Sequence, residues 1–128
     1  MRAVTTAIAA AAIGLQKKAL DNLLGRLDLP EAASGRQGVE RRIPITLLPE
    51  LLLTAELTDQ LDMPIRSAFA LARRLVAGEV SAGPFLQVRA NTVSISEEIE
   101  RQLEVAIETV VRRPRGRPRV RPRASAEA

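Results

Sequence analysis

The chain of 128 residues is long enough for one small domain with extensions, and its net charge of +4 is very unevenly distributed. Residues 112–128 hold seven arginines and one acidic residue (net +6), whereas residues 1–111 hold 12 basic and 14 acidic residues (net −2). Cysteine, histidine, tyrosine and tryptophan are absent. This composition excludes disulfides, thiolate zinc sites and histidine proton transfer, and it leaves too few aromatic rings to stack single-stranded nucleic acid.

Nothing in the sequence arranges its carboxylates, lysines and hydroxyls into a catalytic group, and no glycine-rich phosphate loop is present. We therefore expect a protein that is not an enzyme and that uses no cofactor or metal. Arginine, alanine, proline and glycine are abundant, and their G/C-rich codons suggest a bacterial gene from a GC-rich genome.

The first 29 residues are predicted to form an amphipathic Ala/Leu helix, which covers residues 5–28 and ends before Pro30. Its apolar positions recur at helical spacing; they are Ile13, Leu20, Leu23, Leu24 and Leu27. Such a stripe packs on the domain, pairs with a second copy, or lies on a membrane or storage granule. The first residues superficially resemble a secretory signal, but alanine is too weakly apolar for its core, and we expect a cytoplasmic protein.

After a polar linker at 30–42, residues 43–113 are predicted to form a small α+β domain that is mostly helical. Residues 43–46 are expected to be extended. A helix at 47–61 is followed by another that starts at Pro64 and ends near Ala77. Alternating apolar residues then predict a hairpin with strands at 85–89 and 92–95 and a turn at Ala90-Asn91.

A last helix is predicted from a cap at Ser96 to Arg113, before Pro114. Its apolar stripe is a candidate seam between copies in a homo-oligomer, with Ile99, Leu103, Ile107 and Val110 as the contact residues.

The order of two helices, a hairpin and a further helix is similar to that of a winged helix-turn-helix, and residues 57–71 resemble the helix-turn-helix pattern in part. Asp62 stands where that pattern prefers glycine. The second helix would display Ile65, Arg66, Phe69, Ala70 and Arg73, a set poor in base-reading amides. Secondary contacts with DNA phosphates are expected from Arg66, Arg73, Arg74 and Arg89. Alternatively, this domain serves only to join copies.

Residues 114–128 are predicted to be a disordered basic tail, and residues 113–119 (Arg-Pro-Arg-Gly-Arg-Pro-Arg) resemble the AT-hook motif. The resemblance implies that Arg115, Gly116 and Arg117 enter the narrow minor groove of A·T-rich duplex DNA, since glycine leaves room at the groove floor. The surrounding arginines would contact phosphates; they are Arg112, Arg113, Arg119, Arg121 and Arg123. Because Val120 replaces glycine in the next repeat, we predict one hook only.

These features predict a small nucleoid-associated or transcription-regulatory DNA-binding protein with an oligomerising body. Its hook resembles the Arg-Gly-Arg element that some bacterial nucleoid-associated proteins use, in motif only. One alternative is an adaptor whose N-terminal helix coats a membrane or granule and whose tail tethers it nonspecifically to nucleic acid. Another is a tail that binds DNA or RNA without any base preference.

Overall fold

The computed structural model describes residues 2–32 and 41–112, which form a mostly helical body with short antiparallel strand pairs. In chain order its elements are β1 (Ala3–Thr5), α1 (Thr6–Ile13), α2 (Lys17–Leu27), a 3-10 turn (Pro30–Ala32), β2 (Arg42–Pro44), a second 3-10 turn (Ile45–Leu47), α3 (Leu48–Leu61), α4 (Ile65–Val76), β3 (Ser81–Ala82), β4 (Gln87–Val88) and α5 (Thr92–Arg112). The mostly helical α+β class is thus confirmed.

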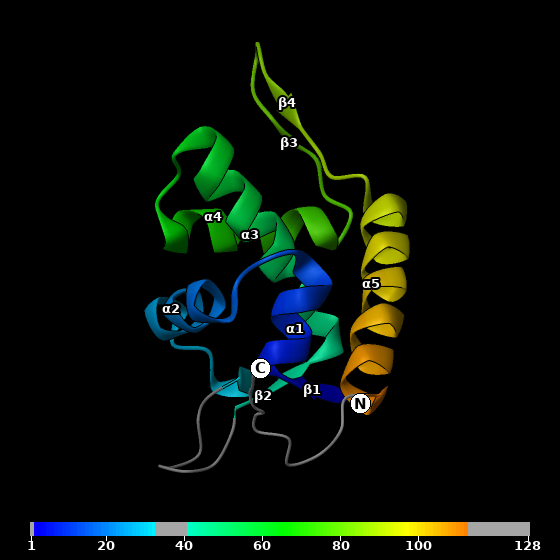
Figure 1. Ribbon diagram of the computed structural model, residues 1–128. Coiled ribbons are helices and arrows are strands. Elements are labelled where there is room, and N and C mark those ends of the chain that lie inside the picture. Colours follow the sequence, from blue (N-terminus) through cyan, green and yellow to red (C-terminus); the bar gives the residue numbers. More distant parts are fainter. Residues whose placement is uncertain (1, 33–40, 113–128) are drawn as a thin grey trace, which may run out of the picture.

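The N-terminal segment is part of the same core as the rest of the body. β1 pairs with β2 in an antiparallel register that places Val4 opposite Ile43, so strand pairing joins residues about 40 positions apart. Next to this pair, α1 packs against α5 (Figure 1). Ala9, Ala10 and Ala12 are almost fully buried, and their small side chains let α1 pack closely against its neighbouring helices.

The prediction of one helix over residues 5–28 is wrong, because the chain turns at Gly14. Gly14 has a φ of 77°, and its N–H caps α1 by donating to carbonyls of the last turn. Glycine adopts this left-handed conformation without the steric cost that a Cβ brings. The second helix, α2, then buries Leu20, Leu23 and Leu24 against the body. The apolar stripe therefore packs on the domain.

The predicted hairpin is also wrong in register. β3 pairs with β4, with Ser81 opposite Val88, so the turn lies at residues 83–86 rather than at Ala90-Asn91. The segment at 92–95 is the first turn of α5. Asn91 begins this helix because its side-chain oxygen accepts a hydrogen bond from the Ser94 N–H at 3.1 Å, which replaces the predicted cap at Ser96.

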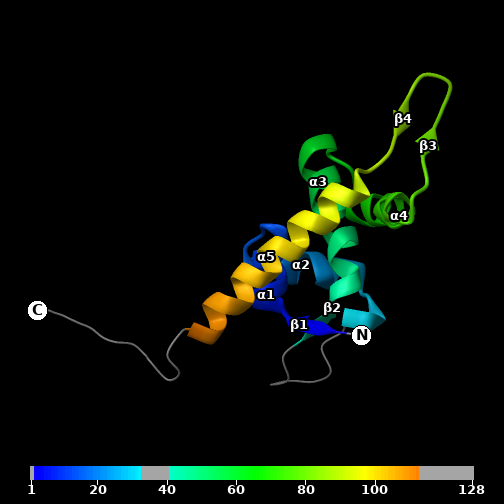
Figure 2. The same ribbon diagram turned by 90° about the vertical axis from the view of Figure 1, so that its right-hand side faces the viewer.

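Two views show how the elements are arranged along the molecule. The β3–β4 hairpin projects from one end, near α3 and α4, while the β1–β2 pair and the C-terminal end of α5 lie toward the other (Figures 1 and 2). With 21 residues, α5 is about 30 Å long and connects the two ends.

Candidate nucleic-acid interface

The turn between α3 and α4 has a left-handed backbone conformation, which favours glycine. Asp62 ends α3 with a φ of 56°, in the left-handed region that glycine adopts readily and aspartate tolerates. Pro64 then precedes α4, and its carbonyl accepts the N–H of Ala68 at 2.8 Å. The two helices are thus joined by a tight three-residue turn, as in a helix-turn-helix.

One side of α4 is buried and the other carries arginines. The buried side consists of Ala68, Phe69, Ala72 and Leu75. The outer face of α4, as we call the exposed side, consists of Arg66, Ser67, Ala70, Arg73 and Arg74. Phe69, which we predicted to be displayed, packs inward because it completes the core beneath the helix, and Ile65 is half-buried. The outer face therefore carries three arginines and no acidic residue.

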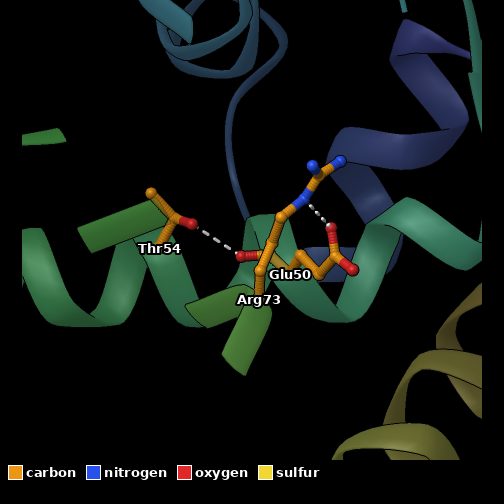
Figure 3. Close-up of polar contacts among 3 residues, drawn as sticks. All are labelled: Glu50, Thr54 and Arg73. Atoms are coloured by element: carbon orange, nitrogen blue, oxygen red, sulfur yellow. Dashed lines mark hydrogen bonds and ion pairs between the residues drawn. The ribbon is translucent and has the colours of Figure 1, made fainter. Parts of the chain in front are cut away.

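Two of these arginines form ion pairs with neighbouring segments. The Arg73 Nε donates to the Glu50 carboxylate on α3 at 3.0 Å, and the Thr54 hydroxyl donates to the Glu50 carbonyl at 2.7 Å (Figure 3). The guanidinium of Arg73 also lies 4.7 Å from the centre of the Phe69 ring. Arg74 pairs with Glu79 at 3.0 Å. The Arg74–Glu79 pair is largely solvated, whereas the Glu50 side chain is only 19% exposed. A DNA phosphate therefore competes more readily with Glu79 than with Glu50.

Charge in the body is segregated by position. Residues 64–96, which include α4 and the hairpin, hold four basic residues and one acidic residue, net +3. The remainder of residues 1–111 holds eight basic and 13 acidic residues, net −5. The net charge of −2 for the whole body thus conceals a basic segment, from α4 through the hairpin, to which Arg66, Arg74 and the exposed Arg89 contribute. The adjoining α3 and the first turns of α5 are acidic.

The hairpin presents apolar side chains to solvent at its tip. Phe85 is 98% exposed and Leu86 is 70% exposed. The turn is closed by the Gly83 N–H, which donates to the Leu86 carbonyl at 2.7 Å. Sequence reasoning missed this tip because it assigned Phe85 and Leu86 to a strand. The adjacent Gly83-Pro84 pair does predict a turn, but one that ends before Phe85, whereas the turn extends to Leu86.

The hook residues Arg115, Gly116 and Arg117 lie outside the described residues, as do Arg113, Arg119, Arg121 and Arg123. Arg112 is the last residue of α5. The end of α5 from which the tail continues therefore lies away from the hairpin (Figure 2).

The predicted seam between copies needs correction at two of its residues. Ile99 and Leu103 are buried inside a single chain, in the core that includes α1. They cannot also form a contact surface between two chains. Ile107 is half-buried, and the side chain of Val110 lies outside the described residues.

An open groove of about 1130 Å³ between α2 and α3 has the opposite character from α4. Asp21, Glu56 and Asp59 line it, with Arg26 as its basic residue, so it repels nucleic acid. Within residues 2–32 and 41–112, no group of three or more carboxylates is placed to hold a metal ion. No helix of the described chain is both long and apolar enough to span a bilayer.

Comparisons with known proteins leave this geometry as the main guide to function. No protein-family model matches the chain, and no match was found among curated proteins or solved structures.

Proposed function

We propose that this chain is a small DNA-binding protein, nucleoid-associated or transcription-regulatory, that reads the minor groove of A·T-rich DNA through Arg115, Gly116 and Arg117. The observation that carries the proposal is the Arg-Gly-Arg-Pro sequence at 115–118, inside a tail of net charge +6. A·T pairs present only acceptors on the groove floor, which suits two arginines separated by a residue without a side chain.

The arginines of α4 and the hairpin support the same proposal. In it, the tight turn between α3 and α4, the three arginines exposed on α4 and the adjacent hairpin would serve as a winged-helix-like DNA-binding surface. Arg66, Arg73, Arg74 and Arg89 would contact phosphates there. A single hook binds weakly, so several tails on one homo-oligomer would raise the apparent affinity by roughly 10²-fold or more.

The adaptor hypothesis receives less support. It requires the apolar stripe of the first 29 residues to lie on a membrane or granule. Leu20, Leu23 and Leu24 are instead covered by the core of the body, which leaves that face with nothing to bind.

The test is fluorescence-anisotropy binding to A·T-rich and G·C-rich duplexes of equal length at about 0.15 M salt, a concentration at which bare electrostatic attraction is screened. Wild type is compared with Gly116→Val, which keeps every charge but places a β-branched side chain at the groove floor. We expect a preference for A·T-rich DNA in wild type that is lost in the variant.

Equal binding of both duplexes by both proteins would show that the tail is only a charged tether. In that case Arg115, Gly116 and Arg117 have no reading role, and the proposal is wrong.

A further inference from the structure

The hairpin tip, which we define as Pro84, Phe85 and Leu86, is the most exposed apolar feature of the described residues. The chain has only two aromatic residues, Phe69 and Phe85. One is buried under α4, and the other is almost fully exposed at the tip. Exposed aromatic side chains on a projecting element are typical anchors for a binding partner.

The hairpin is held in place at its base and closed at its turn. Val88 and Ala90 are partly buried against the cluster of α3 and α4 that contains Leu53, Ala68 and Leu75. The Gly83–Leu86 hydrogen bond and the β3–β4 pairing fix the turn. The tip is therefore presented away from the helices rather than packed on them (Figures 1 and 2).

Charge favours a polyanionic partner for this tip. From Val80 to Ser96, Arg89 is the single charged residue in the sequence. Beside the hairpin, α4 contains three arginines and no acidic residue between Ile65 and Val76. A duplex offers what these groups require, because phosphates lie at its edges and flat apolar surfaces lie between its base pairs.

We propose that Phe85 inserts as a wedge between base pairs of duplex DNA, with Pro84 and Leu86 beside it and the arginines of α4 and Arg89 on the flanking phosphates. Partial unstacking kinks the duplex at the point of insertion, and pyrimidine–purine steps such as TA yield most easily. This inference rests on the proposed function, to which it adds a second, distorting contact by the body.

The experiment measures the end-to-end distance of a duplex of about 30 base pairs with a central TA step, by energy transfer between dyes at its ends. Saturating wild-type protein is compared with Phe85→Ala. The matched control is Val105→Ala, which truncates an apolar side chain that is 54% exposed on α5. Because Phe85 is almost fully exposed, its replacement leaves the core intact.

We expect wild type and Val105→Ala to shorten the end-to-end distance, and Phe85→Ala to leave it as in free DNA. Loss of one stacked ring should also weaken binding of this duplex about tenfold. If wild type binds the duplex without shortening it, or if Phe85→Ala shortens it equally, the wedge is wrong and the proposed function stands. If wild type binds no DNA, the proposed function itself has failed.

Sedimentation velocity without DNA tests another use of the tip. If wild type self-associates and Phe85→Ala does not, then the tip contacts a second copy of the chain, and the wedge is overturned. We expect the two proteins to sediment alike.

Discussion

At the scale of single residues, Asp62 shows how a turn that favours glycine is built without it. Its positive φ costs an aspartate more than a glycine, and its negative charge at the C-terminal end of α3 opposes the helix dipole. We expect Asp62→Gly to raise the free energy of unfolding by up to about 1 kcal/mol, measured by urea denaturation.

Asp59→Gly provides the matched comparison, since this exposed residue has helical backbone within α3. There glycine should lower the free energy of unfolding by about 0.3 kcal/mol, because aspartate is only slightly the better helix former. Equal effects of the two substitutions would contradict the role assigned to the conformation of Asp62.

The ion pair with Glu50 partly neutralises Arg73 and so weakens the attraction between Arg73 and a DNA phosphate. Replacing Glu50 by glutamine removes the carboxylate that holds the Arg73 Nε at 3.0 Å. We expect Glu50→Gln to bind duplex DNA about threefold more tightly at low salt. It should lose about 1 kcal/mol of stability, because the Glu50 side chain is only 19% exposed although Arg73 is solvated. Anisotropy and urea denaturation measure the two effects.

Glu56→Gln serves as the control for Glu50→Gln. It removes the same charge from α3, but Glu56 lines the groove facing α2 rather than α4. If both variants bind DNA alike, the effect is one of net charge, and α4 is not part of the interface.

At the scale of elements, the start of α5 depends on Asn91. Asn91→Ala removes the oxygen that accepts the Ser94 N–H and should lower the free energy of unfolding by about 1 kcal/mol, measured by thermal or urea denaturation. Asn22→Ala, at an exposed position within α2, should be neutral or slightly stabilising because alanine is the better helix former. A cap at Ser96 instead would make Asn91→Ala harmless.

At the scale of the whole molecule, the tail should dominate the salt dependence of DNA binding. Each phosphate contact contributes about −0.9 to the slope of log affinity against log salt, so four or five tail contacts amount to a slope of about −4. We expect removal of residues 113–128 to reduce the slope by about that amount. The shallow slope that remains would come from the arginines of α4 and from Arg89.

Gly116→Val is the control for truncation, because it keeps all seven arginines of residues 112–128. Its slope should equal that of wild type even though its preference for A·T pairs is lost. A truncated protein with the slope of the full chain would place the phosphate contacts in the body instead.

Local sequence signals were sufficient to predict a helix where a proline marks its boundary. The helices predicted at 47–61 and from Pro64 to Ala77 are confirmed within one residue as α3 and α4, because Pro64 restricts the residue before it and suits the start of a helix. The last helix was also predicted, but not its first turn. Residues 92–95 include Val93 and Ile95, and such β-branched residues favour strands unless a cap at Asn91 and packing on the body decide otherwise.

Contacts between distant parts of the chain were not predictable in the same way. Pairing of β1 with β2 places Val4 opposite Ile43. The residues of one strand do not indicate which other segment it will pair with. The same holds for α1 against α5, which converts the predicted seam at Ile99 and Leu103 into core. An apolar stripe in the sequence predicts that one face of a helix is buried. It does not predict whether that face packs on its own chain or on a second copy.

Three features follow from the order of the residues alone: the division into a basic tail and a mildly acidic body, the Arg-Gly-Arg-Pro motif, and the turn between α3 and α4. They depend on composition or on neighbouring residues. Tertiary packing settles that Phe69 is buried while the arginines of α4 stay exposed, that the N-terminal helices are core, and that Phe85 stands exposed at the end of a hairpin. Those facts follow from which apolar surfaces pack together, and that choice is made by the whole chain at once.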